Sequence, residues 1–374
     1  MNGQVNRSEV AKDLYCLETT GSSRQIGLKY AAAFQRELAK AVGISRAALA
    51  GRFEEDQIQR VVAEMSEAFR RNFPYLWDEL VAISAGADIR LSDFQRQVFS
   101  AGVGPFSAED GCTDVIFPSS DQGPLLGKTH DATSPDPGVA VVRRIHHEST
   151  YTVLCVTRID GLSTMTGLNE KGLAIGEASI HFHSVNRTGT IRNLLVRPVL
   201  HECGNVKEAV EFLAAHPPLS AGFHFALVDA SGNAAIVERS PIDQNVRWSK
   251  GEAIFCTNHA ATPSVRALEK SRGPEGDRNS DARFENLKTL TSNANVEFSL
   301  GSMKEILKFH DITGSICQHG DPEYKGEQRL FYPMFTQRAF INIVKSGTLL
   351  VANGKPCQTS FMEFLLHTDR TQSK

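Results

Sequence analysis

A glycine followed by a cysteine, Gly111-Cys112, is the pair of residues with the clearest chemical potential in this sequence. Glycine has no Cβ, so its peptide can take strained conformations and a nucleophile can approach its carbonyl carbon closely. The thiol of Cys112 can attack that carbonyl, move the acyl group from nitrogen to sulfur, and leave a thioester that water cleaves. The product would be a chain that begins with Cys112.

Such a cleavage would place a nucleophile and a base in one residue. The reference pKa is about 8 for an α-amine and about 8.5 for a thiol. Part of the amine is therefore neutral near pH 7 and can accept the proton of its own thiol, without a separate catalytic histidine. A Gly-Cys dipeptide alone is a weak signal, but this one lies where a helical pattern gives way to strands.

The residues before position 100 are predicted to form helices. Between 54 and 71, apolar residues recur at helical spacing and form one stripe: Ile58, Val61, Val62, Met65, Ala68 and Phe69. A second helix is predicted at about 26–41, and Pro74 is expected to begin a third. Ser92 and Asp93 are cap candidates for a fourth. Nothing in this part suggests catalysis, so it is interpreted as a helical packing unit.

After residue 110, short strand-like runs alternate with helical patterns. Strands are predicted at 139–142, 151–156, 173–175, 223–229, 234–238, 339–345 and 348–352, the last four as two hairpins. Helices are predicted at about 190–202, 206–215, 281–291 and 302–310, and residues 271–281 are expected to be a polar loop. This alternation predicts an α+β protein whose helices pack on the outer faces of its sheets.

Colinear motifs across nearly the whole chain resemble a known family. Asp110-Gly111-Cys112-Thr113 is followed by Leu-Gly-Lys-Thr-His-Asp at 126–131 and by Thr-Gly-Leu-Asn-Glu-Lys-Gly-Leu-Ala at 166–174. Shorter matches follow the same order, at 19–27, 257–259, 283–287, 314–317 and 340–344. Together they resemble the acyl-coenzyme A:6-aminopenicillanate acyltransferase family, which belongs to the N-terminal-nucleophile (Ntn) hydrolases.

The resemblance implies a four-layer αββα fold, in which two stacked antiparallel sheets lie between helical layers. It also implies a precursor that cleaves itself into residues 1–111 and 112–374, which remain one compact domain. Cys112 would be both the autoproteolytic residue and the later acyl acceptor. The side-chain amide of Asn258 would help to form the oxyanion hole, and Asp131 would hold the new amine by a charge-assisted bond.

The sequence also departs from the family pattern at the site. The family usually has Gln-Asn and an aromatic residue before the aspartate, whereas Lys128-Thr129-His130 precedes Asp131 here. His130 is expected to add charge to the pocket or to change its shape. The penicillin-forming enzyme has an arginine where an ungapped match gives Thr336. Arg338 lies two residues further on and would reach that place only if the loop shifted, so neither residue receives the role.

The composition excludes several classes of function. The 374 residues can bury a sizeable core, and 40 Lys and Arg against 43 Asp and Glu give a net charge of −3. No basic excess favours nucleic acid, and no apolar stretch reaches the roughly 18–20 residues that span a bilayer. The first residues lack the apolar core of a signal peptide, so a cytoplasmic location is expected.

The seven cysteines are scattered and form no C-x-x-C pair, so neither a disulfide framework nor a zinc motif is predicted. His181 and His183 have the spacing of half a metal site, but no third ligand is suggested. The sequence therefore predicts no metal and no cofactor. All cysteines except Cys112 are expected to be packing residues.

Three functions remain open at this stage. The favoured one is hydrolysis of the amide bond of a small N-acyl amine through a Cys112 thioester, because water is always present. The first alternative is an acyl-coenzyme A-dependent N-acyltransferase, and the second is an unprocessed relative that binds a small amide without catalysis. The expected partners are a small amide or thioester substrate and the cleaved N-terminal segment, without nucleic acid or membrane. A homo-oligomer is compatible with the sequence.

Overall fold

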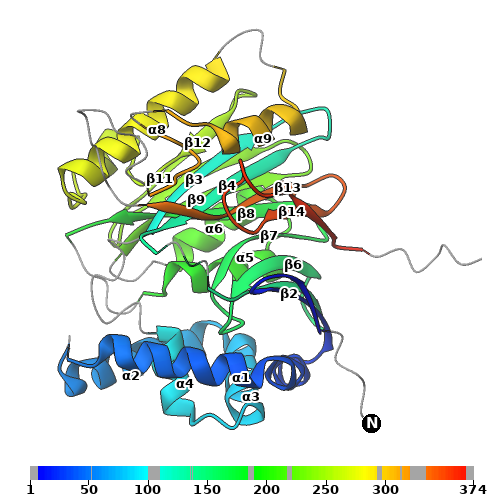
Figure 1. Cartoon of the computed structure of the whole chain (residues 1–374), viewed down its shortest axis with the longest axis vertical. Coiled ribbons are helices and arrows are strands. Elements are labelled where there is room, and N and C mark those ends of the chain that lie inside the picture. The colour runs from blue at the N-terminus through cyan, green and yellow to red at the C-terminus, as the bar shows by residue number, and fades with distance from the viewer. Residues whose placement is uncertain are drawn as a thin grey trace, which may run out of the picture.

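The computed structural model describes residues 7–51, 53–99, 110–134, 136, 138–183, 189–216, 221–292, 297–311, 314–320 and 334–367. Two β-sheets are stacked on one another, and helices cover the outer face of each sheet (Figure 1). This arrangement is the four-layer αββα fold of the α+β class that the sequence predicted. In the described part of the chain, no helix has both the length and the apolar character that crossing a membrane requires.

The larger sheet has nine strands. Their order is β1 (Arg7–Ala11), β2 (Leu14–Gly21), β5 (Ala140–His147), β6 (Val153–Arg158), β7 (Thr164–Asn169), β8 (Leu173–His181), β9 (Ala221–Asp229), β10 (Ala234–Arg239) and β11 (Gln244–Trp248). All neighbours are antiparallel except β2 and β5, which are parallel. The parallel pair joins the N-terminal segment to the rest of the sheet.

The smaller sheet has six strands, all antiparallel to their neighbours. Their order is β12 (Ile254–Cys256), β3 (Asp110–Phe117), β4 (Leu125–Ala132), β13 (Phe335–Ile343), β14 (Thr348–Ala352) and β15 (Met362–Leu365). The strand that carries Cys112, β3, thus lies inside the sheet, between β12 and β4.

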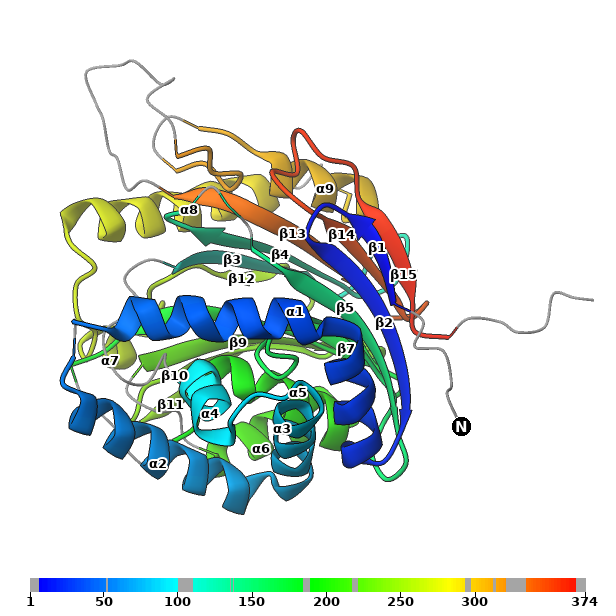
Figure 2. The same ribbon diagram turned by 60° about the horizontal axis from the view of Figure 1, so that its bottom comes forward.

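Helices form the two outer layers. The larger sheet is covered by α1 (Ser23–Leu49), α2 (Glu55–Asn72), α3 (Pro74–Gly86), α4 (Leu91–Phe99), the 3₁₀ turn η3 (Arg192–Leu194), α5 (Val196–Glu202) and α6 (Val206–Ala215) (Figure 2). The smaller sheet is covered by α8 (Pro274–Ser292) and α9 (Leu300–Lys308), which lie at the top of Figure 1. A single turn, α7 (Pro263–Arg266), follows β12.

Three apolar clusters hold the four layers together, and strand β3 takes part in two of them. Cys112 and Ile116 belong to the cluster between the two sheets. Val115 and Phe117 belong to the cluster under α8 and α9. This division follows from the strand geometry, because successive side chains point to opposite faces. The side chain of Cys112 therefore lies between the sheets.

The structure confirms the predicted helices before residue 100 and both hairpins, and it corrects two expectations. The predicted strands omit several that the structure contains, among them β1 and β2, although Leu14, Leu17 and Thr19 of β2 are buried. The polar loop expected at 271–281 was wrong, because α8 begins at Pro274. Proline at the first helical position, followed by acidic residues in the first turn, is a typical helix start.

A buried ion cluster links the N-terminal segment to the rest of the protein. Glu79 of α3 is only 1% exposed and binds two arginines. Arg143 Nη1 of β5 lies 2.8 Å from Glu79 Oε1, and Arg197 Nη2 of α5 lies 2.8 Å from Oε2. The backbone carbonyl of Gly161 accepts from both arginines. The described residues before 100 are thus held by strand pairing, by a shared core and by buried charge.

We predict that Glu79→Gln lowers the free energy of unfolding by about 3–5 kcal/mol at pH 7, because two buried guanidinium groups lose their counter-charge. Burial opposes ionisation of Glu79, yet the two arginines hold its pKa at about 2, well below the usual range. This stabilisation is therefore present above about pH 4.5 and is lost as the pH falls towards 2. Urea unfolding of both proteins across this pH range measures the difference.

Glu67→Gln is the matched control, because Glu67 forms an exposed ion pair with Arg70 on α2. Its unfolding curve should overlay that of the wild type. Equal losses in the two variants, or a Glu79→Gln effect that persists at low pH, would contradict the prediction.

Candidate active site

The register of three strands brings the predicted site residues together at one end of the smaller sheet. In the pairing of β3 with β4, Gly111 lies opposite Asp131 and Cys112 lies opposite His130. On the other side of β4, strand β13 places Thr336 opposite Asp131. Residues that are far apart in the sequence thus become neighbours through backbone pairing alone.

Cys112 is buried and is held by its backbone. Its amide nitrogen donates to Asn258 Oδ1 at 3.1 Å, and its Sγ lies 3.9 Å from His130 Nδ1. Burial raises the pKa of the thiol to about 12, because the thiolate would lose its hydration, and the charge of Lys128 only partly offsets this effect. In the uncut chain the thiol is therefore protonated at neutral pH, and any attack by sulfur needs a base.

Asn258 follows β12 and presents its side-chain oxygen to Cys112. Arg283 Nη2 donates to Asn258 Oδ1 at 2.6 Å, while Asn258 Nδ2 donates to the Ser179 carbonyl at 3.1 Å. The Cys112 amide and the Arg283 guanidinium can only donate, so the oxygen must face them. In this arrangement the amide group expected in the oxyanion hole points to Ser179, and that role stays a prediction.

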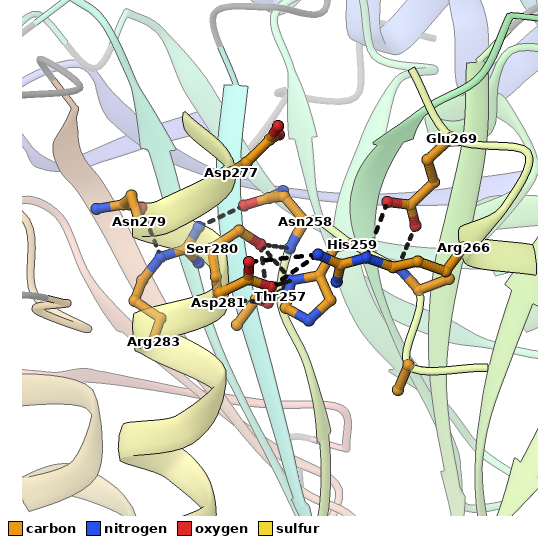
Figure 3. Close-up of polar contacts among 12 residues, drawn as sticks. Thr257, Asn258, His259, Arg266, Glu269, Asp277, Asn279, Ser280, Asp281 and Arg283 are labelled. Carbon is orange, nitrogen blue, oxygen red and sulfur yellow. Dashed lines mark hydrogen bonds and ion pairs between the residues drawn. The ribbon is translucent and has the colours of Figure 1, made fainter. Parts of the chain in front are cut away.

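The network around Asn258 continues into helix α8 (Figure 3). The backbone nitrogen of Asn258 donates to Ser280 Oγ at 2.9 Å, and Ser280 Oγ lies 2.8 Å from His259 Nδ1. Burial and the charge of nearby arginines, Arg266 first among them, lower the pKa of His259 to about 2, so the ring is neutral. Ser280 can then donate to the ring while it accepts from Asn258. The stretch expected to be a polar loop thus positions a site residue.

Arg283 of α8 contacts the site directly, although the sequence predicted no role for it. It is 2% exposed and donates to the Cys112 carbonyl oxygen at 2.6 Å and to Thr113 Oγ1 at 2.8 Å. Its Nε donates to Asn279 Oδ1 at 2.9 Å, on the side away from Asn258 (Figure 3). Burial lowers the pKa of Arg283 to about 10, so the group keeps its charge at neutral pH. The only sequence signal was the family-like motif at 283–287.

Asp131 is fully buried and accepts from three side chains. The donors are Thr336 Oγ1 at 2.6 Å, Gln318 Nε2 at 2.9 Å and Thr129 Oγ1 at 3.3 Å. Burial raises the pKa of this carboxyl group, and the charge of Arg283 and the bonds from Thr336 and Gln318 oppose the rise. Thr336 therefore contributes a hydrogen bond where a charged arginine was considered. Gln318 was not predicted.

Arg338 lies further along the same strand, beyond an irregularity in the register between it and Thr336. Its Nε donates to Asn353 Oδ1 at 2.8 Å, and its Nη2 donates to the Gly138 carbonyl at 2.6 Å. These contacts tie Arg338 to the backbone and side chain of neighbouring loops.

A second group of buried charges lies beside Cys112, between the sheets. Lys128 Nζ is 3.6 Å from Asp114 Oδ2 and also donates to the Glu177 carbonyl oxygen. Burial raises the pKa of Asp114 to about 6, although Lys128 favours its charged form. A Cβ at position 176 would lie 2.2 Å from Asp114 Oδ1, so only glycine permits this close approach of the two sheets. Among the charged groups around Cys112, Lys128 has the largest effect on the pKa of the thiol, and it lowers that pKa.

The fold and the comparisons agree on the class of the protein. The four-layer αββα fold is the one that the resemblance to the Ntn hydrolases implied. The family model for acyl-coenzyme A:6-aminopenicillanic acid acyl-transferase matches residues 119–329, which is more than half of the chain. The chain belongs to this family. No curated protein sequence matches it significantly.

Solved structures with a similar arrangement include two bacterial enzymes and one from an animal. A mutant conjugated bile acid hydrolase from Clostridium perfringens is 14% identical, with a TM-score of 0.44 over 70% of this chain and 98% of that one. The penicillin V acylase of Agrobacterium tumefaciens is 16% identical, with a TM-score of 0.39 over 65% and 83%. The N-acylethanolamine-hydrolyzing acid amidase orthologue of Caenorhabditis elegans is 14% identical, with a TM-score of 0.41 over 63% and 93%. At these scores the family assignment depends on the sequence match.

We predict that Ser280→Ala lowers the free energy of unfolding by about 1–3 kcal/mol, because the buried backbone nitrogen of Asn258 loses its acceptor. Ser292→Ala is a matched control on the same helix, since Ser292 is exposed and bonds only weakly to the Thr289 carbonyl at 3.4 Å. Urea unfolding compares the two variants with the wild type. Equal stability of all three proteins would contradict this account of the network.

Proposed function

We propose that the protein cleaves itself between Gly111 and Cys112 and then hydrolyses the amide bond of a small N-acyl amine. The observation that carries the proposal is the convergence of Asp131, His130, Asn258 and Arg283 on a buried Gly-Cys peptide in a central strand. Membership of the acyltransferase family supports the same reaction class. The two fragments would be residues 1–111 and 112–374, held as one domain by the contacts described above.

The first step is the attack of Cys112 Sγ on the carbonyl carbon of Gly111. Because the thiol is protonated in the uncut chain, a base must take its proton, and His130 Nδ1 lies 3.9 Å away. The S–C bond forms, the C–N bond breaks, and the departing nitrogen takes a proton to become the α-amine of Cys112. Water then hydrolyses the thioester and releases the carboxylate of Gly111.

The same contacts prepare the cleaved enzyme for turnover. The new amine of Cys112 stays beside Asn258 Oδ1, and Asp131 lies opposite the former position of Gly111. Asp131 can hold the protonated amine by a charge-assisted bond. In its neutral form the amine takes the proton of the thiol, and the sulfur attacks the substrate carbonyl.

The remaining steps transfer the acyl group of the substrate first to the Cys112 sulfur and then to water. The substrate oxyanion would be held by backbone N–H groups and by the amide of Asn258, once that amide turns from Ser179 towards the substrate. The leaving amine takes the proton from the Cys112 α-amine. Water then attacks the thioester and regenerates the thiol. Hydrolysis is favoured over transfer because a transferase needs a second amine site from which water is excluded.

We predict that wild-type protein separates into two fragments on a denaturing gel and that Cys112→Ala remains one chain without amidase activity. The substitution removes the sulfur that is proposed to form the thioester. Intact mass and N-terminal sequencing measure the result, and the larger wild-type fragment should begin with Cys112.

Cys16→Ala is the control, because Cys16 lies on β2 of the other sheet; it should be cut and active. A wild-type chain that stays whole would instead favour the unprocessed ligand-binding alternative. A cut Cys112→Ala protein would refute the proposed nucleophile.

A panel of N-acyl amines and acyl-coenzyme A thioesters then separates hydrolysis from transfer. The proposal expects amine release from N-acyl amines that stops in Cys112→Ala. Faster acylation of an added amine by an acyl-coenzyme A donor than hydrolysis of that donor would identify the enzyme as a transferase instead.

We further predict that His130→Gln slows self-cleavage by about 10²-fold or more, which is the usual contribution of a general base. Glutamine keeps a polar side chain of similar length but cannot take the thiol proton. In the protein that is eventually cut, kcat/KM should fall far less, because the Cys112 α-amine then serves as the base. Time courses on denaturing gels measure the first rate, and amide hydrolysis by the isolated cut protein measures the second. An unchanged cleavage rate would exclude His130 as the base.

A further inference from the structure

Four potential metal ligands converge outside the candidate active site. They are His310, Cys317, His319 and Cys357, and all four ligand atoms lie within 4.8 Å of one another. They come from three stretches of chain: the residues that follow α9, the segment 314–320, and the loop between β14 and β15. We propose that these four side chains bind one structural zinc ion.

Four of the six distances between the ligand atoms are close to those of a tetrahedral zinc site, and all six are within 4.8 Å. With Zn–S bonds of about 2.3 Å and Zn–N bonds of about 2.0–2.1 Å, a tetrahedron places two sulfurs about 3.8 Å apart, two nitrogens about 3.3 Å apart, and sulfur and nitrogen about 3.5 Å apart. Here Cys317 Sγ and Cys357 Sγ are 3.6 Å apart, and His310 Nε2 and His319 Nε2 are 3.0 Å apart. His319 Nε2 lies 3.6 Å from Cys317 Sγ and 3.2 Å from Cys357 Sγ.

Hydrogen bonding alone does not explain this geometry. His319 Nε2 lies close to three other atoms, the two thiol sulfurs and His310 Nε2. A single ring nitrogen has either one proton or one lone pair, so it can complete only one such bond. A central cation allows all four lone pairs to point inward and satisfies every ligand at once.

The donor set selects the metal. Two thiolates and two imidazoles are soft or borderline ligands, which suit zinc and disfavour magnesium or calcium. Four protein ligands close the coordination sphere, as in structural zinc sites, and leave no position for water. The zinc ion would therefore hold chain segments together and take no part in catalysis.

The spacing explains why the sequence did not predict this site. Cys317 and His319 are separated by one residue, but His310 precedes them by several residues and Cys357 follows them after a further strand pair. No C-x-x-C or H-x-x-x-H pattern results. The proposal replaces two expectations, namely that no metal is bound and that Cys317 and Cys357 only pack.

A disulfide between Cys317 and Cys357 is the competing interpretation. Its bond length would be about 2.05 Å, whereas the sulfurs lie 3.6 Å apart. A disulfide would also leave the approach of two imidazole nitrogens to both sulfurs unexplained. The two interpretations make different predictions for the metal content of the protein.

We predict about one zinc ion per chain in full-length protein that is expressed without a polyhistidine tag and purified without chelators. Cys357→Ser should contain at least about tenfold less zinc than the wild type, since even outer-shell changes at metal sites cost 10–100-fold in affinity. Cys357 is exposed, so the substitution should not disturb the core. Elemental analysis by plasma mass spectrometry measures zinc, with Cys16→Ser as the matched control that keeps it.

Cobalt provides a second readout. The metal-free wild type reconstituted with Co²⁺ should show the visible absorption of a tetrahedral thiolate complex, and Cys357→Ser should not. If Cys357→Ser fails to fold by circular dichroism, His310→Gln replaces it with the same expected loss. Folded wild type without zinc and without the cobalt spectrum would overturn the proposal. So would equal zinc in wild type and variant, or an intact mass that shows a Cys317–Cys357 disulfide.

Discussion

The pairing register of strand β3 with strand β4 is the constraint on which the candidate site depends. It places Gly111 opposite Asp131 and Cys112 opposite His130. A shift of one residue would turn every side chain of β3 to the other face of the sheet. Such a shift is opposed by the two cores on either side, since Ile116 packs between the sheets and Phe117 packs under the outer helices. Ordinary hydrophobic burial therefore aims the sulfur of Cys112 between the sheets.

The charges around Cys112 are stable there only because each has a partner. Arg283 lies against the backbone carbonyl of Cys112 and the side chain of Asn258. Lys128 is paired with Asp114 on the inter-sheet side. An unpaired buried charge would cost several kcal/mol, so these partners are a condition for placing positive charge near the thiol. They also fix donors and acceptors in position before any substrate binds, which is how polar groups lower the cost of charge development in a reaction.

The sequence predicted the parts of the fold and site that local patterns encode. Gly111-Cys112, Asp131 and Asn258 belong to short motifs, and they do lie together. Arg283, Ser280 and Gln318 are equally close to the site but were missed, because their roles arise from how α8 and an irregular segment pack against β3 and β4. Strand β2 was missed for the same reason, since its stability comes from pairing with β5, which follows it by more than a hundred residues. The same holds for the four proposed zinc ligands, whose proximity exists only after folding.

The segment 314–320 shows how the two proposed sites are related. It has little regular structure of its own, only an isolated bridge between His319 and Phe335, yet it supplies Gln318, which donates to Asp131. Gln318 is also bonded to Thr336 through both of its backbone groups, each at 2.8 Å. Fixing an irregular backbone costs about 1–2 kcal/mol of conformational entropy per residue, and the bonds from the backbone nitrogens of Ile316 and Cys317 to the Phe309 carbonyl offset part of this cost. Because Gln318 lies between Cys317 and His319, a zinc ion on those two neighbours would fix the segment on both sides of the group that orients Asp131.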